Sequence, residues 1–286
     1  MILNGITIAT IVAALIALIL FLRFETKSIT VTNYKINLDL GIEKPVRILQ
    51  VSDLQSRYFG KNQNKLILKC KEERPDAIVI SGDLIDRNFT DYRAAACAVK
   101  GLAEIAPLFY VDGNHETALN PDEYREFLES ESGLMDVLFN RCTDFECRGV
   151  TFHMCGLCED TINKSRGYDR DCRDYDEAVI IDVLGELARD CFDGPKLLLA
   201  HEPQIIDIYA KGGFDIVYSG HAHGGQFRIP FTGQGLYAPE QGALPKYTQG
   251  LHKCGSGLMV ISRGLGNSTF PFRLFNRPEL VVTDIV

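Results

Sequence analysis

The order of apolar and polar positions predicts one long apolar helix followed by alternating strands and helices. Residues 2–22 are almost all apolar, and as a helix they would span roughly 30 Å, the hydrocarbon thickness of a bilayer. From residue 28 onward, short apolar runs typical of buried strands alternate with longer runs of helical period. Strands are expected at 28–34, 46–51, 77–80, 108–111, 196–200 and 216–218, and helices at 66–73, 92–105, 121–129 and 175–189. The composition does not shift along this part of the chain, so we expect an anchor over 1–27 and one domain over 28–286.

The apolar N-terminal run has two interpretations, an uncleaved anchor and a cleaved signal peptide. The chain has no Lys or Arg before the run and no clear small-x-small cleavage site after it, which favours a single-pass anchor in the cell membrane. Arg23 and Lys27 follow the run, and the positive-inside rule then leaves the domain on the cytoplasmic side. The bilayer is therefore an expected partner.

Composition narrows the class of protein. The chain has 286 residues, 46% of them hydrophobic and 24% charged, which is typical of a globular protein. A net charge of -8 disfavours nucleic-acid binding, because phosphate backbones recruit basic residues. No feature implies an obligate protein partner. Nine scattered cysteines are interpreted mainly as reduced thiols, in agreement with the cytoplasm. A zinc site formed by Cys142, Cys147, Cys155 and Cys158 is the less favoured alternative.

Polar side chains follow five of the predicted strands. Ligands of open α/β sheets gather beyond the carboxyl ends of strands, so these residues predict one shared site. Four of the six histidines belong to this set, and a set of oxygen and imidazole ligands suits Mn, Fe or Zn better than a thiolate site does. An H-x-H pair on an extended segment would point both rings to one side. The strand-end residues are Asp53, Asp83, Asn114 with His115, His201, and His221 with His223.

As a set, these motifs resemble those of the calcineurin-like metallophosphoesterases in order and spacing. The matching text is Asp53, Gly82-Asp83, Gly113-Asn114-His115-Glu116, His201 and Gly220-His221-Ala222-His223. The text around 225–226, 262–266 and 277–280 is similar to membrane-associated bacterial members, which include enzymes acting on lipid-linked nucleotide sugars. The resemblance implies an α/β fold of two packed mixed β-sheets flanked by helices, a four-layer α/β/β/α sandwich.

The resemblance also implies a dinuclear metal centre and a role for each matching residue. Asp83 would bridge two divalent ions, with Mn expected and Fe or Zn as alternatives. The implied reaction is hydrolysis of a phosphoester or pyrophosphate bond by a two-metal-activated hydroxide, on a phosphorylated small molecule or a lipid-linked envelope substrate. Asp53 and His223 would hold the first ion; Asn114, His201 and His221 would hold the second; and His115 would donate a proton to the leaving oxygen.

One position departs from the family pattern. The family usually carries Asp-x-His in its first motif, whereas this chain has Asp53-Leu54-Gln55. An amide oxygen is a weaker ligand than imidazole for zinc or iron. Gln55 could ligate the first ion, leave its place to water, or mark a catalytically weakened, membrane-tethered metal- or nucleotide-binding module.

Further residues are expected around the ligands. Arg57, Arg263 and Arg273 are candidate phosphate contacts, because a guanidinium matches phosphate geometry, with a purely structural role as the alternative. Asp86, Asp112 and Glu116 are expected to support the site without binding metal.

Overall fold

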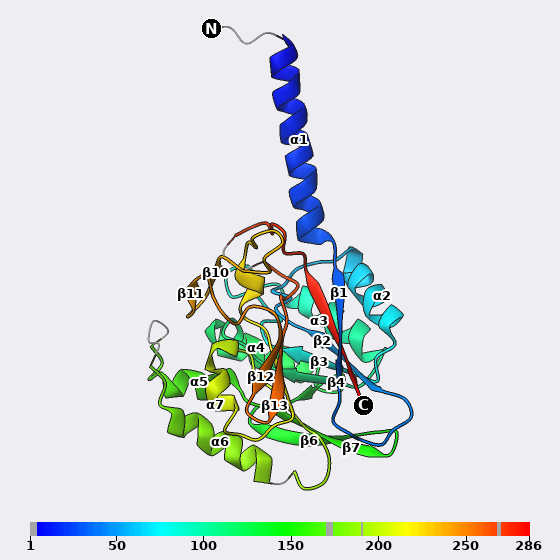
Figure 1. Cartoon of the computed structure of the whole chain (residues 1–286), viewed down its shortest axis with the longest axis vertical. Helices are drawn as coiled ribbons and strands as arrows, with labels where there is room; N and C mark the ends of the chain where they lie inside the picture. Colours follow the sequence, from blue (N-terminus) through cyan, green and yellow to red (C-terminus); the bar gives the residue numbers. More distant parts are fainter. Residues whose placement is uncertain (1–4, 170–173, 190, 268–269) are drawn as a thin grey trace.

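A long helix rises from one end of a layered domain in this computed structural model, which describes residues 5–169, 174–189, 191–267 and 270–286 (Figure 1). The helix α1 (Gly5–Lys27) is almost entirely apolar, and its most apolar stretch is not buried against the domain. Its length and composition suit a membrane span, and a signal sequence has the same properties.

Two mixed six-stranded sheets form the centre of the domain. In the first sheet the parallel strands β2 to β5 lie beside β14, which is antiparallel to β2, and β1 pairs in parallel with β14. In the second sheet β7, β8, β9 and β13 are parallel, with antiparallel strands at both edges.

The strands have the following bounds. The order in the first sheet is β1 (Thr30–Ile36), β14 (Glu279–Ile285), β2 (Val46–Val51), β3 (Ala77–Ser81), β4 (Leu108–Val111) and β5 (Asp136–Val137). The order in the second is β12 (Gly250–Cys254), β13 (Gly257–Ile261), β9 (Ile216–Ser219), β8 (Lys196–Leu199), β7 (Val150–Gly156) and β6 (Arg141–Cys147), and β10 (Tyr237–Ala238) pairs separately with β11 (Gly242–Ala243).

Three apolar cores hold four layers together. The middle core lies between the sheets and takes alternate residues of both, such as Ile48 and Val79 from the first and Leu197 and Tyr218 from the second. The outer cores lie between each sheet and its helices, and they include Leu66 and Val99 on one side and Ile180 and Leu184 on the other. The helices are α2 (Asn64–Glu73), α3 (Tyr92–Ala103) and α4 (Pro121–Ser130) on the first sheet, and α5 (Glu159–Ser165), α6 (Glu177–Arg189) and α7 (Ile206–Tyr209) on the second. The four-layer α/β/β/α prediction is confirmed.

The strand directions bring α1 to a particular edge of the first sheet. The strand β1 is parallel to β14, and β14 is antiparallel to β2, so β1 runs opposite to β2. It therefore begins, at Thr30, on the edge where β2, β3 and β4 end. Helix α1 ends at Lys27, with only two residues between it and β1, and so rises from the carboxyl edge of these strands.

Most predicted elements appear within a residue or two of their expected bounds, and five strands of five or more residues are not among those predicted. The predicted strands at 46–51 and 108–111 coincide with β2 and β4. The unpredicted strands are β6, β7, β12, β13 and β14. In β14, five of the seven residues are apolar or β-branched and buried. No turn signal ties β14 to β2, because the two strands lie more than two hundred residues apart in the chain.

The cysteines require a correction. Cys142 of β6 and Cys155 of β7 lie directly opposite one another and form a disulfide, so the expectation of reduced thiols is wrong for this pair. The four-cysteine zinc alternative fails as well, because Cys147 lies about 16 Å farther along β6. Disulfides persist mainly in oxidising compartments, so the cysteines no longer support the cytoplasmic side.

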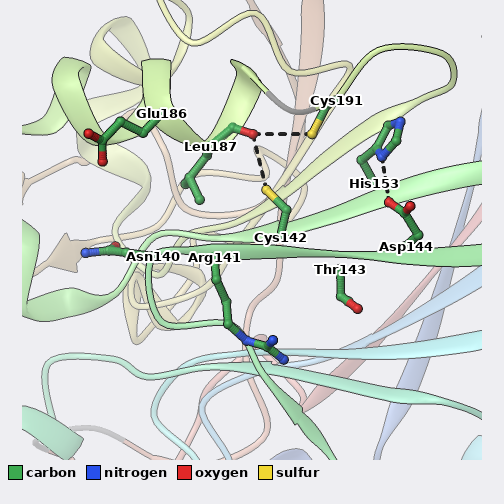
Figure 2. A pocket seen from close by; sticks show the side chains of 9 residues that line it. All are labelled: Asn140, Arg141, Cys142, Thr143, Asp144, His153, Glu186, Leu187 and Cys191. Carbon is green, nitrogen blue, oxygen red and sulfur yellow. Dashed lines mark hydrogen bonds and ion pairs between the residues drawn. The ribbon is translucent and has the colours of Figure 1, made fainter.

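The disulfide borders a pocket of about 520 Å³ on the outer side of the second sheet. Figure 2 shows the sulfur atoms of Cys142 and Cys191 directed at the carbonyl oxygen of Leu187, each at 3.3 Å. In the same pocket His153 contacts the Asp144 carboxylate at 2.8 Å. The lining residues come from β6, β7 and the end of α6, away from the residues predicted to bind metal.

Candidate metal centre

The Asp83 carboxylate lies at the middle of the predicted site and is shared by two groups of potential ligands. Asp83 follows β3 and is 1% exposed. Its Oδ2 atom lies 3.3 Å from His201 Nε2 and 3.3 Å from Gln55 Nε2. Ligand atoms of Asp53, Asp83 and His223 lie within 4.8 Å of one another, and so do those of Asp83, His201 and His221. The structure therefore brings the ends of five strands from both sheets to one place.

The first group surrounds the amide of Gln55. His223 Nε2 lies 3.3 Å from Asp53 Oδ1 and 3.0 Å from Gln55 Nε2. Rotation of the Gln55 amide by 180° exchanges its nitrogen and oxygen, so the side chain can present an oxygen at the same point. Asp53 is held by the Ser52 hydroxyl, which donates to Oδ2 at 2.5 Å, and by the His221 amide, which donates to Oδ1 at 2.9 Å.

The second group contains two histidines whose ring orientations are fixed by hydrogen bonds. His201 Nδ1 donates to the carbonyl oxygen of Ser81 at 2.7 Å, which leaves Nε2 directed at Asp83. His221 Nδ1 lies 2.9 Å from Asn114 Oδ1, and its Nε2 lies 2.6 Å from Glu240 Oε2. A carboxylate on the outer nitrogen is the arrangement that orients metal-binding histidines in proteins. Sequence reasoning missed Glu240, because it lies in the turn between β10 and β11 with no motif around it.

The backbone at the site departs from the regular strands that the sequence predicts. Positive φ angles occur at Asp53 (50°), Gln55 (47°), Asp83 (52°), His221 (65°) and His223 (45°). Such left-handed conformations cost about 1–3 kcal/mol each for residues other than glycine, and they gather where surrounding contacts enforce them. The extended H-x-H expectation is therefore wrong, since each ring joins a different group beside Asp83. Strand alternation does not explain the position of Gln55 either, although its side chain does face the first group.

The Glu116 carboxylate is one of the contacts that enforce this backbone. It accepts the amides of Asp83 at 3.0 Å, Ile85 at 2.8 Å and Gly113 at 2.8 Å. Burial and the nearby Asp83 charge raise the pKa of Glu116 well above its usual range. Asp112 supports a different part, since its Oδ1 atom accepts the amide of Glu159 at 2.9 Å.

The buried acidic and basic side chains of the site shift one another's pKa values. Burial opposes ionisation of Asp83, but His115, His201 and His221 hold its pKa well below the usual range. Burial also lowers the pKa of His201, and the Asp83 carboxylate overcomes this and raises it to about 10. At His223 burial outweighs the attraction of Asp53 and lowers the pKa to about 4, so this ring is neutral and ready to act as a ligand. Because His201 carries a proton at neutral pH, cation binding there would release one.

The donor set fits divalent cations. His223 Nδ1 and Gln55 Oε1 are buried and have no hydrogen-bond partner among the described residues, a condition that is unfavourable for polar atoms unless a ligand satisfies them. Carboxylate, amide and imidazole atoms together are the ligands that Mn, Fe and Zn accept. Metal ligation by Asp53, Gln55, Asp83, Asn114, His201, His221 and His223 thus agrees with the geometry and stays a prediction.

His115 lies at the edge of the two groups. Its Nδ1 accepts the amide of Arg87 at 3.2 Å and lies 3.5 Å from Asp86 Oδ1. Its Nε2 faces inward, 3.8 Å from Asp83 Oδ2. A ring whose Nδ1 accepts a hydrogen bond carries its proton on Nε2, so His115 directs an N–H at the centre of the site. Asp86 lies behind this ring, in agreement with the expected supporting role.

The three arginines predicted to contact phosphate differ in their surroundings. The Arg273 guanidinium is buried and donates to the carbonyl oxygens of Gly266, Asn276 and Arg263. The Arg263 guanidinium pairs with the Glu279 carboxylate at 2.9 Å. These contacts favour structural roles for both. Arg57 is half-buried. Burial lowers the pKa of its guanidinium, and the Asp86 carboxylate opposes this shift. Arg57 therefore remains the candidate phosphate contact.

Comparisons with known proteins agree with this geometry. The model of the family described as calcineurin-like phosphoesterase matches residues 46–225, more than half of the chain. A phosphodiesterase of Escherichia coli K12, YaeI, is 28% identical, with 85% of this chain and 83% of that protein covered. An uncharacterized metallophosphoesterase of Bacillus subtilis, YkuE, is 27% identical over 82% of this chain and 77% of its own length. The crystal structure of TT1561 of Thermus thermophilus shares the fold, with a TM-score of 0.53, 15% identity, and 77% of this chain and 90% of that one covered.

Replacing Glu240 tests whether its carboxylate orients His221. Glu240→Gln keeps the size of the side chain and removes its charge, so the affinity of the second group for Mn²⁺ should fall about 10–100-fold. Titration calorimetry of the full chain measures this change. The control Glu123→Gln alters an exposed carboxylate on α4 and should bind Mn²⁺ as the unaltered chain does. Equal affinities for all three proteins would show that Glu240 does not support the site.

Two replacements of Gln55 should shift metal binding in opposite directions. Gln55→His supplies an imidazole and should raise the affinity of the first group and shift its preference from Mn²⁺ toward Zn²⁺. Gln55→Leu has a similar size and no ligand atom, and should lower the affinity. Competition between Mn²⁺ and Zn²⁺ in equilibrium dialysis gives both quantities. If neither variant changes them, Gln55 is not a ligand.

Proposed function

The chain belongs to the calcineurin-like phosphoesterase family, a family of metal-dependent hydrolases, and on this basis we propose that it hydrolyses a phosphoester or pyrophosphate bond at a dinuclear metal centre. The observation that carries the proposal is the position of Asp83. One buried carboxylate belongs to two groups of ligand atoms, each compact enough for one ion. A carboxylate shared in this way can hold two cations close together.

The metals would supply charge stabilisation for the transferred phosphoryl group and a lower pKa for a coordinated water. Asp53, Gln55 and His223 would hold one cation, and Asn114, His201 and His221 the other, with Asp83 between them. The histidine orientations described above pre-organise these ligands, and a site fixed before the substrate arrives needs little reorganisation during the reaction.

His115 is the proposed general acid. Burial lowers its pKa, but the carboxylates of Asp83 and Asp86 raise it above the usual value, so the ring can carry a proton near neutral pH. In the charged ring both nitrogens carry a proton: Nδ1 lies 3.5 Å from the Asp86 carboxylate, and Nε2 faces into the site. From there the Nε2 proton can pass to the oxygen of the leaving group as the bond to phosphorus breaks.

The proposed substrate is a phosphorylated lipid-linked or envelope-related molecule. The apolar helix α1 supports this, since it would hold the domain at a membrane surface. The E. coli relative is described as a phosphodiesterase, which supports a diester bond. We propose residues 1–27 as the anchor and 28–286 as the catalytic domain, on the cytoplasmic side according to Arg23 and Lys27. With a net charge of -8, nucleic acid is not an expected substrate.

The function is tested by turnover of bis-p-nitrophenyl phosphate, p-nitrophenyl phosphate and nucleotide-linked lipids with and without added Mn²⁺. We expect metal-dependent hydrolysis that is abolished in Asp83→Ala, because this change removes the ligand common to both groups. Absence of metal-dependent turnover on every ester would favour the alternative function, a membrane-tethered metal- or nucleotide-binding module weakened at Gln55.

Replacement of His115 separates proton donation from metal binding. His115→Ala should lower kcat roughly 10²–10⁴-fold on esters with poor leaving groups and far less on p-nitrophenyl esters, because p-nitrophenolate leaves without a proton. The metal content should not change. His153→Ala is the control, since His153 contacts Asp144 in the remote pocket of Figure 2. Equal losses on good and poor leaving groups would contradict the role as an acid.

A further inference from the structure

Two segments beside the base of α1 expose an unusual amount of apolar surface. The segments 227–236 and 270–277 are joined side by side, since the Arg228 amide donates to the Leu274 carbonyl oxygen at 3.1 Å. Phe231 is 109% exposed, Phe275 47% and Ile229 38%. Large apolar side chains gathered in this way mark a contact surface when a partner is available to cover them.

These segments are attached directly to the end of α1. Phe275 packs on Phe21 with ring centroids 5.8 Å apart, and the Arg277 guanidinium lies 5.6 Å from the ring centroid of Phe24. The backbone amide of Asn276 donates to the Glu25 carboxylate, and the backbone amide of Arg273 donates to Thr26 Oγ1. Where α1 leaves a bilayer, the segments would lie at the level of the headgroups, where aromatic side chains are enriched. Figure 1 shows the orange and red segments around the base of this helix.

A basic pocket of about 460 Å³ lies between the same segments and α1. Arg228, Arg263 and Arg277 line it, and among the described residues of the lining Glu25 is the one acidic side chain. Burial and the neighbouring Arg263 lower the pKa of Arg228 to about 10, and Glu279, which pairs with Arg263, opposes this shift. Three guanidinium groups are therefore accompanied by two carboxylates, Glu25 and Glu279, and the positive charge is only partly compensated. The Nε atom of Arg263 is buried and finds no hydrogen-bond partner in the described part of the chain. An anion with several oxygen acceptors suits such a pocket.

We propose that this face is a second membrane contact, in which Ile229, Phe231 and Phe275 enter the interface and the arginine pocket binds the phosphate of an anionic phospholipid. The occupant is a lipid of the bilayer that holds α1, because the helix brings this face to that surface. The pocket is positive although the chain has a net charge of -8, so it complements an anionic leaflet.

The contact would also orient the metal centre. Asn276 Nδ2 donates to the carbonyl oxygen of His223 at 2.7 Å, so the membrane-facing segment is bonded to the first ligand group. The strands that carry the ligands end on the edge from which α1 rises. The inference therefore deepens the proposed function and rests on it for the substrate, whereas the membrane contact itself requires only that α1 spans the bilayer.

The chain contains no tryptophan, so a single introduced indole reports its own surroundings. The full chain with Phe231→Trp is reconstituted into phosphatidylcholine vesicles that carry bromine near the top of the acyl chains. We expect strong quenching of its fluorescence. The control Phe192→Trp replaces a residue that is 82% exposed and precedes β8, at the strand edge opposite to the metal ligands, and it should be quenched by acrylamide only. Equal behaviour of the two reporters would overturn the membrane contact.

The headgroup pocket is tested with the Phe231→Trp reporter at equal bromine content. Brominated phosphatidylglycerol should quench it more effectively than brominated phosphatidylcholine, and Arg277→Gln should reduce this preference about fivefold. Arg125→Gln, on exposed α4, should leave the preference unchanged. Equal quenching by both lipids in the unaltered pocket would overturn phosphate binding. These readouts do not use catalysis, so a chain that shows them without metal-dependent turnover would contradict the proposed function alone.

Discussion

The compensation of the buried Asp83 charge is the interaction on which the site depends. A carboxylate that is 1% exposed is strongly unfavourable unless cations surround it. In the ion-free chain His115, His201 and His221 supply the compensating charge, and His201 holds a proton with a pKa of about 10. Divalent cations would replace the protons of His201 and His221 and leave these two rings neutral, which is the form that binds metal. The buried charge of Asp83 therefore explains both why three histidines surround it and why divalent cations suit the site.

The two sheets supply the acidic residues and the histidines of the site from opposite sides. Asp53, Asp83 and Asn114 follow strands of the first sheet, and His201, His221 and His223 follow strands of the second. The left-handed backbone at five of the site residues turns their side chains toward one another, and Glu116 holds the part of it around Asp83 by accepting the amides of Asp83, Ile85 and Gly113. The middle core between the sheets keeps the two halves in register. The packing of the two sheets against each other thus maintains the strained left-handed backbone of the site residues.

The sequence predicts the parts of this site that lie next to strong local patterns. Asp53, Asp83 and His201 follow short apolar runs, and His221 and His223 stand in a glycine-flanked motif, so their convergence can be expected before the fold is known. Glu240 and Asn276 lie in loops with no periodicity, and only the folded chain brings them to His221 and His223. The Cys142–Cys155 pairing depends on the register of a hairpin, which a one-residue shift would destroy. The strand β14 escapes prediction because its partners are distant in sequence.

A candidate metal centre and the surface proposed to contact the membrane lie on the same edge of one domain, linked through Asn276. The central claim is that Asp83 holds two cations at once. The most direct measurement is the number of Mn²⁺ ions bound per chain at saturating Mn²⁺, by equilibrium dialysis and elemental analysis, for the unaltered protein and for Asp83→Ala. We predict two ions for the former and fewer for the latter. A single ion in the unaltered protein, or two ions retained in Asp83→Ala, would contradict the claim.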